Sequence, residues 1–196
     1  RAGQWIEDNF RARDALGGYS GGFEGWENSK GSPAGSTKIG WRSTEHCIDL
    51  YVAFSKLAIA KKSAVWQERA YHARQFALNM WEDGRFWMGI KDSSGEKNKE
   101  AVPTDVQVWS VLGMGHDTEY RRRTGWPGPP SIPACVAWVD KKCRVESKSA
   151  GDPSGYLFSD KGKGCWFEGA AQLAAVYGYL GNIERGEAVL AEVVRA

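Results

Sequence analysis

The sequence has no excess of charge of either sign and no long apolar run. Its 26 Lys and Arg residues nearly balance its 24 Asp and Glu residues, for a formal net charge of +2. Nucleic-acid-binding domains usually carry a strong basic excess, so we expect no nucleic-acid partner. No apolar run approaches the ~18 residues that cross a membrane, so we expect no membrane span. The chain starts at Arg1 rather than Met, so we expect a removed leader or a longer parent protein. A secreted or a periplasmic location fits these features, and the sequence fixes neither.

The sequence also lacks residues spaced as metal ligands. No two of its 3 His residues have the spacing of a metal-binding pair and no C-x-x-C motif occurs, so we predict neither a metal site nor a cofactor. The cysteines could form two disulfides in any of three pairings or remain buried free thiols; they are Cys47, Cys135, Cys143 and Cys165. Cys135 and Cys143 would lie ~12 Å apart along one helix and could not pair there. A bridge from Cys143 to Cys165 remains open.

Aromatic residues are the abundant class. The chain has 10 Trp, 7 Tyr and 7 Phe among 196 residues, of which 42% are hydrophobic and 26% charged. This composition is typical of a globular protein, and at ~150 residues per domain we expect one domain over residues 1–196. A Gly- and Ser-rich loop over residues 17–40 carries Tyr19, Phe23 and Trp26. Loops that hold aromatic residues without a helical period are often binding surfaces.

Apolar periodicity predicts an all-α chain with short β-hairpins in its loops. Helices are expected over residues 4–15, 43–60, 63–81, 104–113, 134–145, 167–180 and 183–195, and short strands near 85–91, 102 and 156–158. Thr104 and Gln107 have the spacing of a capping box. Apolar helices opened by Glu45, Asp105 and Glu168 recur at intervals of about 60 residues, and amphipathic helices accompany them. The sequence therefore predicts three αα-hairpins in an arc, with an apolar inner layer and a striped outer layer.

Inner helices that point the same way would bring their first turns to one rim. These starts, at residues 41–46, 103–109 and 165–169, hold carboxylates, indoles and one arginine, a combination that suits carbohydrate. We predict Glu168, Asp105 and Glu45 as catalytic residues. Trp166 and Phe167 would raise the pKa of Glu168 and make it the acid, whereas a helix start would keep Asp105 ionised as base or nucleophile. The predicted substrate-binding residues are Trp41, Arg42, Trp87, Gln107, Trp109 and Trp166.

Each of these residues also has a structural interpretation. Acidic residues are common in first helical turns simply because they complement the helix dipole. Arg42 would hold either a substrate hydroxyl or Glu45, and in the second case it forms only an ion pair.

Four segments carry a resemblance to a known family. They are W-R-S-T-E-H-C-I-D-L-Y-V-A-F-S-K-L-A (41–58), R-F-W-M-G (85–89), V-P-T-D-V-Q-V-W (102–109) and C-W-F-E-G-A-A-Q-L-A (165–174). Over about residues 19–183 the chain resembles a bacterial family of six-hairpin glycosidase-like proteins, which are similar to (α/α)6-toroid glycoside hydrolases. A full toroid needs about twelve helices, so the resemblance implies the C-terminal half of such a protein. Cys47 and Cys165 depart from the family pattern.

Two functions of different class follow. The first is a glycan-acting enzyme, most simply a glycoside hydrolase with paired carboxylates at the rim of an aromatic-lined cleft, or else a phosphorylase or lyase. The second is a non-catalytic module that binds glycans or assembles with itself. A half toroid would expose the edges of its inner helices, so we expect a homo-oligomer or a missing N-terminal half.

Overall fold

The computed structural model describes residues 1–24, 37–146 and 154–195. Residues 25–36 of the predicted loop, with Trp26, lie outside these ranges. The chain forms two compact units, a first unit of Arg1–Asn79 with Gly89–Asn98 and a second unit of Met80–Met88 with Lys99–Ala196. The single domain expected from the sequence stays a prediction, and each unit is described by itself.

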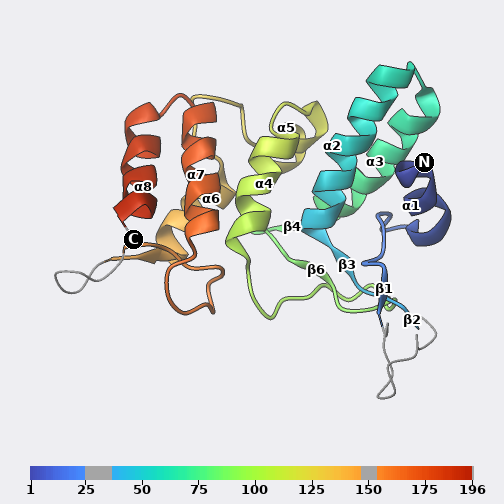
Figure 1. The fold of residues 1–196 in the computed structure, drawn as a ribbon, viewed down its shortest axis with the longest axis horizontal. Helices are drawn as coiled ribbons and strands as arrows, with labels where there is room; N and C mark the ends of the chain where they lie inside the picture. The colour runs from blue at the N-terminus through green and yellow to red at the C-terminus, as the bar shows by residue number, and fades with distance from the viewer. Residues whose placement is uncertain (25–36, 147–153, 196) are drawn as a thin grey trace. The chain divides into compact units, whose positions relative to one another are not determined.

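The first unit is built on a pair of helices. Its helices are α1 (Ala2–Phe10), α2 (Thr44–Lys61) and α3 (Ala64–Asn79), with α2 packed on α3 (Figure 1). Its strand pairs are β1 (Phe23–Glu24) with β2 (Thr37–Lys38) and β3 (Arg42–Ser43) with β6 (Gly89–Ile90), both antiparallel. The Ser43 hydroxyl caps α2 by accepting from the His46 N–H, and Lys62 ends it in a left-handed conformation. These local signals account for the agreement of α2 with the predicted helix.

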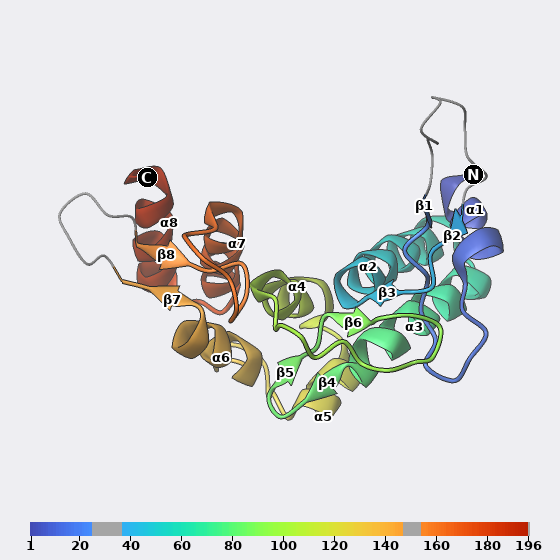
Figure 2. The same ribbon diagram turned by 90° about the horizontal axis from the view of Figure 1, so that it is seen from below.

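The second unit contains two antiparallel strand pairs and a group of helices. The helices are α4 (Thr104–Met114), α5 (Thr118–Thr124), α6 (Ala134–Lys142), α7 (Phe167–Tyr179) and α8 (Ile183–Arg195). The strands are β4 (Trp81–Glu82) with β5 (Arg85–Phe86) and β7 (Arg144–Val145) with β8 (Gly155–Tyr156). Helix α4 packs against α6 and α7, and α7 packs against α8 (Figure 2). Nearly all of α4 is buried, whereas α8 buries only Gly186 and Val189, as expected for inner and outer helices.

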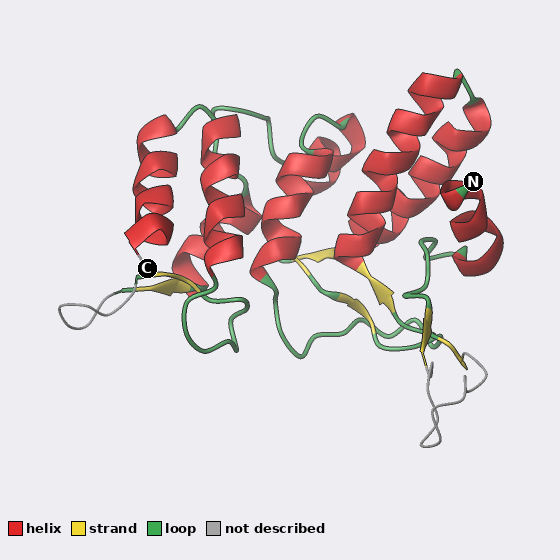
Figure 3. Cartoon of the chain, viewed as in Figure 1, coloured by secondary structure: helices red, strands yellow, loops and turns green. Residues whose placement is uncertain are grey.

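The predicted fold class is therefore confirmed in outline: a helix-rich chain whose described strands are short and antiparallel (Figure 3). No helix in the described ranges is long and apolar enough to cross a membrane. The four cysteines are free thiols, and Cys165 is only half-buried.

Two local expectations were wrong. Helix α1 ends at Phe10 rather than near residue 15, because the chain turns back and the Ala12 N–H donates to the Gly18 carbonyl. Tyr19, expected in a binding loop, is 1% exposed and belongs to the core. Its hydroxyl donates to Glu7 at 2.7 Å, and its ring packs edge-on against Phe54.

The predicted capping box at α4 is also absent. The N-cap of α4 is Pro103, which offers no side-chain hydrogen bond. The Thr104 hydroxyl instead donates to the Leu157 carbonyl at 2.8 Å, and the Gln107 amide bonds to the backbone of Phe86. These side chains satisfy buried backbone groups of distant segments, which outweigh a local cap because an unpaired buried polar group is costly.

Candidate functional site

The starts of α4 and α7 lie at the same end of the second unit (Figure 1). The Thr104 N–H donates to the Phe158 carbonyl at 2.8 Å, and the Trp166 N–H donates to the Tyr156 carbonyl at 2.7 Å. One segment, residues 156–158, thus ties both helix starts together. Two of the three predicted carboxylates, Asp105 and Glu168, are carried by these first turns.

The two carboxylates lie in different environments, and that of Glu168 is not the one expected. Asp105 is 6% exposed, and its Oδ1 accepts from the Val106 N–H at 2.6 Å. Glu168 is exposed, and its Oε1 accepts from the Gln172 amide at 3.4 Å. The expected burial of Glu168 between aromatic rings is therefore wrong. The Trp166 ring packs against Phe158 instead, with ring centroids 5.1 Å apart.

The third carboxylate, Glu45, is half-buried in the first turn of α2 and belongs to the first unit. One turn later, desolvation and then the Glu45 carboxylate raise the pKa of Asp49. The negative charge of Glu45 thus adds to the effect of burial and disfavours the charged form of Asp49.

Arg42 has a structural partner. It is 3% exposed and forms two hydrogen bonds with the Asp14 carboxylate, at 2.9 and 2.7 Å, and one with the Gly17 carbonyl. The Arg42 guanidinium holds the pKa of Asp14 below its usual range. Arg42 therefore pairs with Asp14 rather than with Glu45. It also lines a pocket of about 460 Å³ in the first unit, together with Arg13 and Lys38.

Gln107 is fully buried. Its Oε1 accepts from the Phe86 N–H at 2.9 Å, and its Nε2 donates to the carbonyls of Phe86 and Pro103 at 2.9 and 3.0 Å. These bonds use both ends of the amide. Gln107 therefore fixes β5 to α4, and β5 in turn carries Arg85 and precedes Trp87.

The predicted aromatic residues are spread over both units. In the first unit, Trp41 is 37% exposed and lies beside His46, with ring centroids 5.8 Å apart. In the second unit, Trp166 is half-buried at the N-cap of α7, and Trp109 is half-buried in the second turn of α4 rather than at its start. Trp87 is 7% exposed. Its Nε1 donates to Glu82 at 3.1 Å, and the Arg85 and Lys99 cations lie 4.5 and 5.2 Å from its ring centroid.

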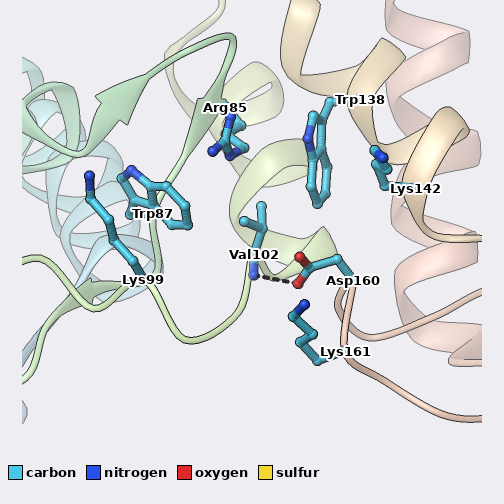
Figure 4. Close-up of a pocket in the computed structure, with 8 residues that line it drawn as sticks. All are labelled: Arg85, Trp87, Lys99, Val102, Trp138, Lys142, Asp160 and Lys161. Atoms are coloured by element: carbon cyan, nitrogen blue, oxygen red, sulfur yellow. Dashed lines mark hydrogen bonds between the residues drawn. The ribbon is translucent and has the colours of Figure 1, made fainter.

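Trp87 lines a pocket of about 490 Å³ that lies wholly within the second unit (Figure 4). The other lining residues are Arg85, Lys99, Val102, Trp138, Lys142, Asp160 and Lys161. Two hydrogen bonds join Val102 to Asp160 at one wall: the Val102 N–H donates to the side-chain Oδ1 of Asp160 at 2.8 Å, and the Asp160 N–H donates to the Val102 carbonyl. Thus the pocket lies directly beside the start of α4.

Sequence reasoning singled out Trp87 but missed the other seven lining residues, among them the second tryptophan, Trp138. It lies on α6, is half-buried, and forms no stacking or cation–π contact with any residue in the described ranges. Figure 4 shows its ring on the opposite side of Val102 from Trp87. The sequence signal was the spacing of Trp138 and Lys142, which places both on one helix face. Within the ranges that the structure describes, no group of three His, Cys, Asp or Glu side chains could hold a metal ion.

Comparison with known proteins gives a likeness of fold. No family model and no curated protein sequence matches the chain. The structure of cellobiose 2-epimerase from Spirochaeta thermophila DSM 6192 is similar, with a TM-score of 0.58 at 11% sequence identity. The match covers 97% of this chain and 49% of that one, so this chain spans about half the length of the neighbour. This likeness supports the partial-toroid fold, whereas membership of the six-hairpin family stays a prediction.

Proposed function

We propose that this chain is part of a carbohydrate-active toroid and that its second unit binds a glycan in the pocket lined by Trp138. The observation that carries the proposal is an unstacked, half-exposed indole in a cavity of about 490 Å³ among polar side chains. Indole faces stack on the apolar faces of sugar rings, while charged and polar groups around them bind hydroxyls. The similar solved structure is that of a cellobiose 2-epimerase, and cellobiose is a disaccharide, which agrees with a saccharide ligand for this pocket.

Glycoside hydrolysis is the activity that we propose for the same end of the unit. Asp105 and Glu168 would supply the two carboxylates. Glu45, the third candidate, belongs to the first unit and is not assigned to this end. The supporting feature is the placement of the first turns of α4 and α7 at one end of the unit (Figure 1), where α4 begins two residues after the pocket residue Val102. In this proposal the buried Asp105 serves as nucleophile or base and the exposed Glu168 as the acid.

Binding is tested first, by isothermal titration calorimetry of the chain against neutral and acidic tetrasaccharides. Trp138→Ala should weaken binding about tenfold or more, because a stacked ring dominates the energetics of such sites. Trp5→Ala is the matched control, since Trp5 is 54% exposed on α1 of the first unit and lines neither pocket. If no oligosaccharide binds, or if both variants behave alike, the proposal fails.

Hydrolysis is tested separately, by assaying Asp105→Asn and Glu168→Gln for sugar release from soluble glycans. A loss of ~10²-fold or more in rate with the fold intact would support acid and base roles. Binding without any turnover in the parent chain would leave the non-catalytic glycan-binding module, with self-association as its accompanying prediction.

A further inference from the structure

The pocket in the second unit concentrates positive charge. Four of its lining side chains are cationic, namely Arg85, Lys99, Lys142 and Lys161, and one, Asp160, is acidic. The whole chain, in contrast, has 26 basic and 24 acidic residues. The cations come from β5, α6 and two loops, so the fold and not a local run of sequence brings them together.

Existing contacts neutralise only part of this charge. Lys99 Nζ pairs with Glu82 at 2.6 Å, and Asp160 accepts the Val102 N–H. Arg85 uses one N–H on the Asp83 carbonyl at 3.2 Å and presents its planar guanidinium over Trp87. Lys142 and Lys161 are exposed and form no ion pair within residues 1–24, 37–146 and 154–195. Two lysines and most of the Arg85 fork are therefore left for a ligand.

We propose that the ligand of this pocket is an anionic saccharide, one whose sugar units carry carboxylate or sulfate groups. The inference rests on the proposed glycan-binding function and narrows its ligand class. Trp138 stacks on a sugar ring, the Arg85 fork binds an anionic group in two-point geometry, and Lys142 and Lys161 attract neighbouring anionic groups as point charges. A neutral sugar would leave these cations without a counter-charge.

The test uses two tetrasaccharides that differ only at C6: cellotetraose and the β-1,4-linked tetramer of glucuronic acid. Binding is measured by isothermal titration calorimetry at 50 and 500 mM NaCl. The intact chain should bind tetraglucuronate about tenfold more tightly than cellotetraose at low salt, and high salt should reduce this preference because it screens exposed charges. Cellotetraose sulfated at C6 forms a third arm, which distinguishes a sulfate preference from a carboxylate preference.

The double variant Lys142→Gln with Lys161→Gln should abolish most of the preference. Its matched control is Lys141→Gln with Lys163→Gln, because these exposed lysines flank the pocket residues in sequence, do not line the pocket and give the same change in net charge. The control should keep the preference of the parent chain.

The outcomes separate the two proposals. Equal affinity for cellotetraose and both anionic tetrasaccharides overturns the anionic ligand and leaves glycan binding intact. A preference that both double variants lose equally reflects net charge and also overturns it. Tight binding of a thymidine tetranucleotide, or full competition by inorganic sulfate, indicates a general anion site and refutes the saccharide assignment. Absence of binding to all three tetrasaccharides refutes glycan binding itself.

Discussion

Gln107 is predicted to contribute to stability rather than to ligand binding, and Gln107→Leu tests this. The substitution keeps a side chain of similar size, so no large cavity forms, but it removes all three hydrogen bonds of the buried amide. The backbone N–H and carbonyl of Phe86, a residue that is 0% exposed, then lose their Gln107 partners. At roughly 1–3 kcal/mol for each buried polar group left unpaired, and less for a carbonyl, the free energy of unfolding should fall by about 3 kcal/mol.

The assay combines chemical denaturation with hydrogen exchange. The Phe86 amide should lose protection in Gln107→Leu, because its acceptor is gone. Gln75→Leu is the matched control: Gln75 is exposed on α3 and, among the described residues, its side chain bonds only Asn79, at 3.2 Å, so its effect should be within ~0.5 kcal/mol. A Gln107→Leu variant with unchanged stability and a protected Phe86 amide would refute the reasoning. Full stability with lost glycan binding would show instead that Gln107 contacts the ligand.

Three other predictions follow from the same structure. Asp14→Ala should lower the free energy of unfolding by about 2 kcal/mol, less than the ~3–5 kcal/mol of a fully buried pair, because Asp14 is 48% exposed. Asp8→Ala on α1 should cost little, so equal denaturation curves for the two variants would contradict this. Gly169→Ala should displace the ring of Trp166, since a Cβ there would lie 2.1 Å from it, and should cost ~1–3 kcal/mol; unchanged tryptophan fluorescence and stability would rule this out. Burial raises the pKa of four tyrosines, namely Tyr19, Tyr120, Tyr156 and Tyr177. Their contribution to the free energy of unfolding is therefore fully present below the unfolded pKa of about 10 and falls as the pH rises above it. Equal free energies of unfolding at about pH 8 and pH 11 would disprove this.

The helices could be predicted because their signals are local. The apolar spacing of residues 48–57 and the Ser43 cap act within one or two turns, so α2 begins and ends close to the expected residues. The same holds for α7 and α8, which begin at the predicted residues. The end of α1 was not predicted correctly, because the hydrogen bond from Ala12 to Gly18, and not the apolar periodicity of the helix, decides where it ends.

The candidate site could be predicted only in part. The sequence correctly placed Asp105 and Glu168 in the first turns of helices, and it singled out Trp87, which lines the pocket. It could not show that Glu168 is exposed, because burial depends on which segments pack around a side chain. The flanking positions of Trp166 and Phe167 in sequence say nothing about where their rings point.

By itself, then, the sequence determined a helix-rich chain with apolar helices, acidic first turns and abundant indoles. Tertiary structure decided the partner of each polar side chain. Arg42 pairs with Asp14 across 28 residues, and Gln107 reaches Phe86 across 21, since the buried Arg42 and Gln107 side chains each need hydrogen-bond partners. Only the fold could bring Trp138 together with cations from distant segments, because a pocket forms where separate elements pack and no single segment of sequence encodes it.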